Sequence, residues 1–293
     1  MNNMKQYSIL VVVALFIAAG CTSRPALIFQ SQTTNAAIPW TDLPFKNNPM
    51  DFQFVILADS TTGSSPAVFN KAIEQVNLLQ PEFVMCVGDL IQGYTDNRDT
   101  LKAQFDEVDS ILQRLEMRFF RVAGNHDISN EIMSEVYRDR YDSSYYYFVY
   151  KNVLFLIIDT EDPSFGSISD TQVSYVKRIL QDNMGVRWTL VFMHQPLFVE
   201  KEGKLQEGWA KIEEMLKDRP HTVFAGHLHS YAKYEKHGRR YIRLATTGGR
   251  SKLSGIENGE FDHILWVTMT DEGPRIANLM LDGIYDENVR VME

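Results

Sequence analysis

Residues 52–59 read Phe-Gln-Phe-Val-Ile-Leu-Ala-Asp, an apolar run that ends in an acidic residue. Five later runs have the same form, because each is rich in apolar residues and stops at Asp, Asn or His. They are residues 83–88 before Asp89, 119–124 before Asn125 and His126, 153–158 before Asp159, 188–193 before His194, and 222–226 before His227 and His229. Runs of this length and composition are typical of strands buried on both faces.

The polar residues at the ends of these runs predict the position of a functional site. Ligands of open α/β sheets bind at the carboxyl ends of the strands, so these side chains are expected to converge on one edge. Carboxylate, amide and imidazole groups are the donors that divalent ions such as Mn, Fe and Zn accept. The pattern therefore predicts a metal site with hydrolytic chemistry.

Composition places the chain among globular proteins. It has 293 residues, of which 44% are hydrophobic, enough for one sizeable domain or two small ones. The net charge of -9 is spread along the sequence, and no basic stripe interleaved with aromatic residues is present. This argues against a nucleic-acid partner, since phosphate neutralisation requires clustered Lys and Arg.

The N-terminus has the form of an export signal. Lys5 precedes an apolar run over residues 9–19 that is too short for a comfortable membrane span. The run ends in Ala18-Ala-Gly-Cys21, which resembles the lipobox of bacterial lipoproteins, although Ala18 stands where the motif usually has Leu. The resemblance implies a signal peptide over residues 1–20 and a lipid on Cys21.

A lipid on Cys21 would anchor the exported protein in the bacterial cell envelope, facing the periplasm or the cell surface. A plain cleaved signal peptide and an uncleaved anchor remain alternatives, and all three place the protein outside the cytoplasm. Residues 21–49, which comprise the lipidated Cys and a polar segment, have the composition of a flexible tether. We expect a catalytic domain over residues 50–285 and a tail over residues 286–293. Cys86, inside an apolar run, is expected to be a buried, inert thiol.

The segments between the apolar runs predict the fold class. A helix should begin at Ser65-Pro66, and another should cover residues 100–115. The order strand, helix, strand, helix, strand indicates a parallel βαβαβ unit. In the second half, strands over 145–149 and 153–158 meet at Lys151-Asn152, helices cover 169–182 and 206–217, and late strands cover 241–245, 261–269 and 274–281. This mixture predicts a second sheet with antiparallel parts.

Four motifs taken together resemble the calcineurin-like metallophosphoesterase family. They are Gly88-Asp89, Gly124-Asn125-His126-Asp127, His194 and Gly226-His227-Leu228-His229. The resemblance covers nearly the whole exported chain, and it implies an α-β-β-α sandwich of two mixed β-sheets flanked by helices. It also implies a metal-dependent phosphoric ester hydrolase with two divalent metal ions.

Carried over residue by residue, the resemblance implies that Asp89 bridges the two metals. Asp59 and His229 would hold the first ion, and the second would be held by Asn125, His194 and His227. Two cations roughly 3.5–4 Å apart can clamp the attacking and leaving oxygens and lower the pKa of a water. His ligands must be neutral, so we expect activity to fail at low pH.

The same resemblance implies two further roles. His126 would contact the phosphate or protonate the leaving oxygen, and Asp127 would pair with His126 and orient it. Phosphorylated small molecules and phosphoproteins are the expected substrates; the motifs do not separate monoesters from diesters, and no feature indicates an oligomeric state.

One position departs from the family pattern. The family usually has Asp-x-His at the first motif, whereas this chain has Asp59-Ser60-Thr61. A hydroxyl is a poor replacement for imidazole, so the first site is expected to have fewer protein ligands. A mononuclear or metal-labile enzyme stays open, as does a catalytically weak envelope binding protein with a degenerate metal site.

Other residues near the motifs have weaker patterns. Asp159 fits either a turn or a position beside the site. His221, His237 and His263 match no motif and are interpreted as surface or packing residues. Residues 246–250, Thr-Thr-Gly-Gly-Arg, lack the ending of a P-loop, and we expect a loop near the site with Arg250 on the substrate.

Overall fold

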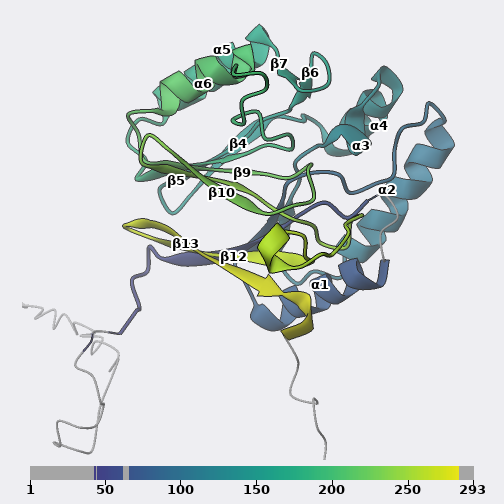
Figure 1. The fold of residues 1–293 in the computed structure, drawn as a ribbon, viewed down its shortest axis with the longest axis horizontal. Coiled ribbons are helices and arrows are strands. Elements are labelled where there is room, and N and C mark those ends of the chain that lie inside the picture. Colours follow the sequence, from purple (N-terminus) through teal and green to yellow (C-terminus); the bar gives the residue numbers. More distant parts are fainter. Residues whose placement is uncertain (1–42, 44, 62–65, 284–293) are drawn as a thin grey trace, which may run out of the picture. The chain divides into compact units, whose positions relative to one another are not determined.

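The computed structural model describes residues 43, 45–61 and 66–283 (Figure 1). The chain divides into two compact units, residues 1–46 and 47–293, and nearly all described residues belong to the second. The predicted signal peptide, Cys21, most of the tether, Ser65 and the tail over 286–293 lie outside the described residues. Within the described ranges, no helix has the length and apolar character needed to cross a bilayer.

The described elements alternate strands and helices in the first half and become richer in strands toward the C-terminus. In chain order they are β1 (Phe52–Leu57), α1 (Pro66–Leu79), β2 (Phe83–Cys86), α2 (Arg98–Leu112), β3 (Arg118–Phe120), α3 (Asn125–Ile128), α4 (Glu131–Tyr141), β4 (Tyr146–Tyr150), β5 (Val153–Ile157), β6 (Glu161–Asp162), β7 (Ser167–Ile168), α5 (Asp170–Asp182), β8 (Trp188–Phe192), α6 (Glu207–Leu216), β9 (His221–Ala225), β10 (Ala232–Lys236), β11 (Arg239–Arg243), η1 (Ile256–Asn258), β12 (His263–Thr270), β13 (Gly273–Met280) and η2 (Leu281–Gly283).

Two large mixed sheets form the centre of the domain. The five-stranded sheet has the order β13-β12-β1-β2-β3, and the six-stranded sheet has the order β10-β11-β9-β8-β5-β4. In the first sheet β1, β2 and β3 are parallel, as the βαβαβ prediction requires. In the second, β5, β8 and β9 are parallel. The α/β sandwich of two mixed sheets flanked by helices is confirmed.

Of the three late strands, β11 lies in the second sheet as predicted, but β12 and β13 do not. The prediction assigned them to the second sheet, but β12 pairs antiparallel with β1 and β13 pairs with β12, so both belong to the first sheet. Leu265 and Val267 of β12 are buried in an apolar core that strands of both sheets share, so burial alone does not indicate the sheet. Periodicity identifies a strand but not the sheet that receives it.

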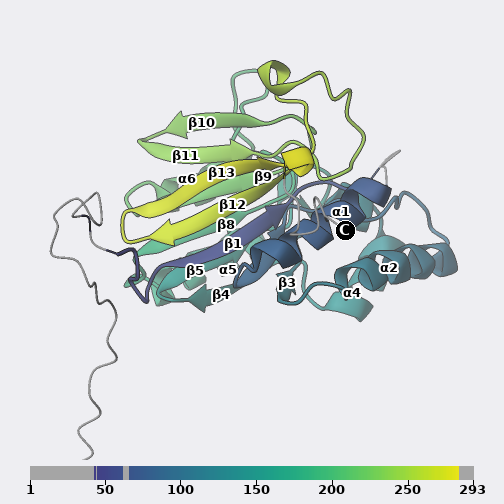
Figure 2. The same cartoon turned by 90° about the horizontal axis from the view of Figure 1, so that it is seen from below.

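The six-stranded sheet separates two apolar layers. On β5, Phe155 faces the core between the sheets, whereas Leu154 and Leu156 face α5 and α6. This alternation is the period of two expected of a strand buried on both faces. Between the sheets, the rings of Phe54 and Phe155 have centroids 5.5 Å apart. The helices α1 and α2 cover the outer face of the five-stranded sheet (Figure 2).

Three local details refine the predictions. The helix α2 begins at Arg98, not at residue 100, because the Asn97 side chain accepts a hydrogen bond from the Thr100 amide at 2.9 Å, and it ends at Leu112, not at residue 115. The strand β3 is partly exposed rather than buried on both faces, since it is an edge strand. The β4–β5 hairpin turns at Lys151 and Asn152 as predicted, with φ of 43° and 59°.

Candidate metal centre

Turns at the carboxyl ends of parallel strands from both sheets bring the six predicted ligands together. The side chains form two groups that could each hold a metal ion. The first group consists of Asp89, His194 and His227, and the second consists of Asp59, Asp89 and His229. Within each group the candidate ligand atoms lie within 4.8 Å of one another. Asp89 is common to both groups, as expected of the residue that the resemblance places between two metals.

His194 lies at the centre of the first group. Its Nδ1 donates to the Val87 carbonyl oxygen at 2.7 Å, which fixes the ring and points Nε2 into the site. Around Nε2, the Asn125 Oδ1 lies at 2.9 Å, the Asp89 Oδ2 at 3.2 Å and the His227 Nδ1 at 3.2 Å. Asn125 therefore joins this group through its amide oxygen.

The spacing of these atoms fits a shared cation. Ligand atoms about 2.0–2.2 Å from one ion lie roughly 3.0–3.5 Å from one another. The distances around the Nε2 of His194 fall in or near this range, as does the 3.3 Å between the His229 Nε2 and the Asp59 Oδ1. In addition, the buried Asp59 Oδ2 has no hydrogen-bond partner among the described residues. The donor set therefore fits divalent metal ions.

The electrostatics of the site also favour a cation. Burial by itself would lower the pKa of His194, but the charges of Asp89 and Asp59 outweigh it and raise that pKa to about 10. Burial would likewise raise the pKa of Asp89, yet His194 holds it below its usual value. Burial and the nearby His194 lower the pKa of His227 to about 4, so that this ring is neutral. In the metal-free site, a proton on His194 thus balances the buried carboxylates.

Asp59 and His229 are positioned by contacts to distant segments. The Asp59 carbonyl oxygen accepts hydrogen bonds from the Thr247 and Gly249 amides at 3.0 and 3.1 Å. His229 donates through Nδ1 to the Arg250 carbonyl oxygen at 2.5 Å, leaving Nε2 toward Asp59. The segment over 246–250 therefore does reach the site, as predicted, through its backbone and through the Thr246 hydroxyl, which donates to the Asp59 carbonyl oxygen at 2.8 Å. The Arg250 side chain is exposed.

The backbone at the strand ends is unusual. Gly88 has a φ of 96°, and Asp89 next to it has a φ of 58°. Gly226 is required by space, because a Cβ there would lie 2.4 Å from the Asp59 Oδ2. His227 and His229 have φ of 73° and 50°, and this bend directs the two imidazoles into different groups.

His126 lies at the edge of the centre and is not in either group. Its Nε2 is 4.0 Å from the Asp89 Oδ2, and its Nδ1 contacts the Gln92 carbonyl oxygen at 2.6 Å. The ring meets the Tyr94 ring edge-on, with centroids 4.6 Å apart. The carbonyl and the aromatic ring together fix the imidazole beside the metal ligands.

The predicted pairing of Asp127 with His126 is wrong. The buried Asp127 carboxylate accepts hydrogen bonds from the amides of Asp89, Leu90, Ile91 and Gly124, at 2.8 to 3.3 Å. Its carboxylate is thus saturated by the turn after β2 and by the start of α3, while the Gln92 carbonyl holds His126. Asp127 joins the backbone segments that carry Asp89 and Asn125.

Sequence reasoning missed Tyr94 and Glu161. The Asn125 Nδ2 donates to the Tyr94 hydroxyl at 2.6 Å, which turns the Asn125 oxygen toward His194. Glu161 accepts a hydrogen bond at 2.6 Å from the Nε2 of Gln195, the residue that follows His194 in the chain. Neither residue belongs to a motif, because each acts through a contact with a segment more than 30 residues away.

Asp159 and the remaining candidates lie outside the metal groups. Asp159 is buried and accepts hydrogen bonds from the Ser144 hydroxyl at 2.6 Å and the Glu161 amide at 2.7 Å, so it shapes the turn after β5. Burial raises its pKa to about 6. His221 and His263 are buried packing residues and His237 is exposed, as interpreted from the sequence. The buried Cys86 has a pKa raised to about 11 by burial and is an inert thiol.

Solved structures of similar fold include phosphatases. A dimetal phosphatase from Danio rerio is 15% identical, with a TM-score of 0.54 over 78% of this chain and 99% of that chain. A purple acid phosphatase from seeds of yellow lupin (Lupinus luteus) is also 15% identical, with a TM-score of 0.61 over 80% of this chain and 53% of that chain. GAP50 of Plasmodium is 14% identical, with a TM-score of 0.59 over 80% and 86% of the two chains.

Sequence comparison gives the family directly. None of the curated protein sequences matches this chain at a significant level. The model of the calcineurin-like phosphoesterase family matches residues 52–231, a range that runs from β1 past His229 and contains all six predicted ligands. With the fold and the Asp and His groups described above, this match shows that the chain belongs to the calcineurin-like phosphoesterase family.

Proposed function

We propose that this protein is a metal-dependent phosphoesterase that hydrolyses a phosphate monoester or diester with metal-activated water. The observation that carries the proposal is the pair of Asp and His groups sharing Asp89 at the junction of the two sheets. Asp59, Asp89 and His229 would hold one divalent ion, and Asp89, Asn125, His194 and His227 the other. Mn, Fe and Zn all suit these nitrogen and oxygen donors.

Bound at these groups, the two ions would supply charge neutralisation for the phosphate and lower the pKa of a water. The protein's own contribution is orientation and proton transfer. Val87 and Arg250 use their carbonyls to aim His194 and His229, and Tyr94 aims the Asn125 oxygen. His126, held by the Gln92 carbonyl, would contact the phosphate or deliver a proton to the leaving oxygen.

Export and lipid anchoring at Cys21 are part of the same proposal. They rest on the N-terminal sequence, where a short apolar run ends in Ala-Ala-Gly-Cys. A phosphorylated small molecule or a phosphoprotein outside the cytoplasm would be the substrate. A lipid at the N-terminus would connect the domain to a membrane through residues 21–49.

An envelope binding protein with a weak metal site is the second candidate. Thr61 favours it, because this buried residue stands where the family usually has an imidazole ligand. The fold is compatible with such a role, since GAP50 of Plasmodium is described as an anchor in the inner membrane complex. The two candidates differ in whether turnover depends on metal.

The test is hydrolysis of 4-nitrophenyl phosphate and bis(4-nitrophenyl) phosphate by the purified protein, after chelation and again with added manganese. Turnover that returns with manganese is expected. His126→Ala should then lower turnover by about 10²–10⁴-fold while bound manganese is unchanged. If turnover survives the substitution, the role of His126 is wrong.

Thr61→His tests the second candidate. A binding protein with a degenerate site should show no metal-dependent turnover with either ester, and the added imidazole should raise its manganese affinity. If the protein is an active phosphoesterase, the natural sequence should instead hydrolyse the esters in a metal-dependent way without the substitution. Bound metal per chain, measured by elemental analysis after dialysis, compares the two variants directly.

A further inference from the structure

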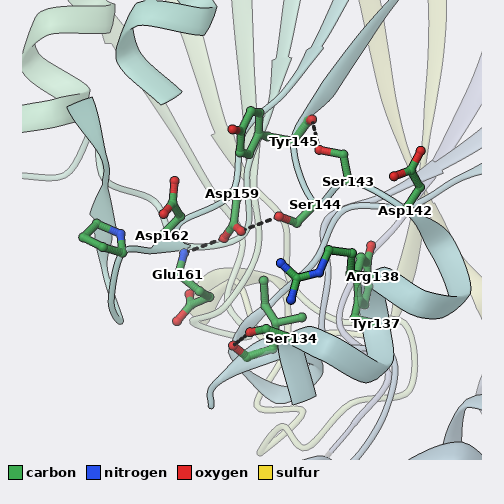
Figure 3. Close-up of a pocket in the computed structure, with 12 residues that line it drawn as sticks. Ser134, Tyr137, Arg138, Asp142, Ser143, Ser144, Tyr145, Asp159, Glu161 and Asp162 are labelled. Atoms are coloured by element: carbon green, nitrogen blue, oxygen red, sulfur yellow. Dashed lines mark hydrogen bonds between the residues drawn. The ribbon is translucent and has the colours of Figure 1, made fainter. Parts of the chain in front are cut away.

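A cavity of about 440 Å³ lies at the carboxyl end of β5 (Figure 3). Its wall comes from α4, from residues 142–145 between α4 and β4, and from the turn after β5. Its charged lining residues are Arg138, Asp142, Asp159, Glu161 and Asp162. The lining thus contains four carboxyl groups and one guanidinium.

One link along the chain and two contacts connect the segments that line this cavity to the metal ligands. Ile128 lines the cavity at one end of α3, and Asn125 begins the same helix at the metal centre. Glu161 lines the cavity and accepts a hydrogen bond from the Gln195 Nε2, and Gln195 follows His194. The same turn also brings the Phe165 ring to 5.8 Å from the His227 ring, measured between centroids. The cavity and the metal ligands are therefore carried by the same short segments of the chain.

Most carboxylates of the cavity already have partners. Asp159 accepts from the Ser144 hydroxyl and the Glu161 amide. Asp162 accepts from the Ser169 hydroxyl at 2.5 Å and from the Gln172 Nε2 at 3.2 Å. Asp142 is exposed at the surface.

Glu161 differs from them. The residue is only 9% exposed, and its Oε1 accepts from Gln195 and from the Thr160 hydroxyl. Its Oε2 is buried without a hydrogen-bond partner among the residues that the structure describes. Burial raises the pKa of Glu161 to about 7. A buried carboxylate oxygen without a donor is costly, and a charged donor supplied by a ligand would remove that cost.

Arg138 is the cationic residue that lines the cavity, but its guanidinium forms no ion pair with Glu161. It extends from α4 toward Asp159 and Glu161 in Figure 3, and no ion pair joins it to a described carboxylate. Its side chain is exposed, so it can remain in solvent.

We propose that this cavity binds a primary ammonium group on the leaving group of the substrate, with Glu161 as its acceptor. The natural substrate would then be a phosphate ester of an amino alcohol. This inference rests on the proposed phosphoesterase function and adds the substrate class. The excess of carboxylates over guanidinium groups favours a cation, and the cavity is wide enough for a small aminoalkyl group.

The experiment compares phosphoethanolamine with n-propyl phosphate, which has the same shape but lacks the charge. Both are assayed with the purified manganese-loaded protein, and the ratio of their kcat/KM values is the readout. Because the two alcohols differ in intrinsic reactivity, only the change of this ratio between variants is interpreted. Glu161→Gln should lower the ratio by about tenfold or more, since it replaces a charged acceptor by a neutral one. The matched control Asp139→Asn removes a charge from an exposed position of α4 outside the cavity and should leave the ratio unchanged.

A second variant covers the case in which Glu161→Gln does not fold. Arg138→Met removes the guanidinium of the cavity at an exposed position, and it should raise the ratio by about threefold, because the ammonium no longer meets a like charge. A ratio that stays within twofold of the natural protein in both variants would overturn the proposal. Hydrolysis of 4-nitrophenyl phosphate without hydrolysis of phosphoethanolamine would also overturn it, while leaving the phosphoesterase function in place.

Discussion

Asp127 shows how one carboxylate can organise a metal site without touching it. It accepts hydrogen bonds from three successive amides after β2 and from the Gly124 amide before α3. Burial, with the charge of Asp89 added, raises the pKa of Asp127 to about 6. The residue therefore positions the backbone of Asp89 and Asn125 rather than the ring of His126.

Asp127→Asn should destabilise the fold by about 2–4 kcal/mol, because the amide group offers one acceptor and turns a donor toward buried amides. Urea unfolding in the presence of a chelator measures this loss without a contribution from metal. Manganese affinity should fall as well, since Asp89 and Asn125 lose their support. Unchanged stability with an altered pH profile of turnover would instead restore the role in orienting His126.

His194 makes metal binding depend on pH. Its pKa in the metal-free site is raised to about 10, so the ring is protonated at neutral pH, and a cation must displace that proton. His227, with a pKa of about 4, adds no such cost. Apparent manganese affinity should therefore rise by about tenfold per pH unit between pH 6 and 9.

Isothermal titration in buffers of different ionisation enthalpy checks this prediction. About one proton per ion should be released at the His194 group at pH 7. Affinity that is flat across this range would mean that His194 is neutral in the metal-free protein.

At the scale of elements, the junction between each strand and its following turn decides the site. The strand β9 ends at Ala225, and Gly226 then passes so close to Asp59 that no side chain fits. A Cβ at this position would lie 2.4 Å from the Asp59 Oδ2 and 2.8 Å from a methyl group of Val87. The turn after β9 thus packs directly onto the ligand that follows β1.

Gly226→Ala should displace the Asp59 carboxylate and weaken metal binding by about tenfold or more, since ligand atoms must be placed to a few tenths of an ångström. Gly185→Ala is the matched control, because a Cβ there meets nothing within 4 Å. The manganese dissociation constant is measured for both variants and for the natural protein. Equal affinity in the two would show that Asp59 does not contribute to binding.

For the whole domain, the metal groups lie where the two sheets meet. Asp59 and Asp89 follow strands of the five-stranded sheet, and His194, His227 and His229 follow strands of the six-stranded sheet. An ion held by residues of both sheets would resist their separation. Metal binding should therefore stabilise the domain against unfolding, independently of catalysis.

Manganese at 100 times its dissociation constant should add about 2.7 kcal/mol of stability. For a domain of this size, that corresponds to a rise in melting temperature of roughly 5–10 °C. Thermal unfolding with a chelator and with manganese gives the shift, and His194→Ala should abolish most of it. A shift of the same size in the variant would place the stabilising ion elsewhere.

The sequence by itself determined the strands that carry the ligands, their order along the chain and the six residues that the structure brings together. It could do so because a ligand placed directly after a parallel strand lies at the carboxyl edge of its sheet, whatever the position of that strand in the sheet. The tertiary structure alone decided which sheet receives β12 and β13, that Asp127 binds backbone amides rather than His126, and that Tyr94 and Glu161 lie beside the ligands. Each of these depends on contacts between segments far apart in the chain, and such contacts leave no local pattern of residues.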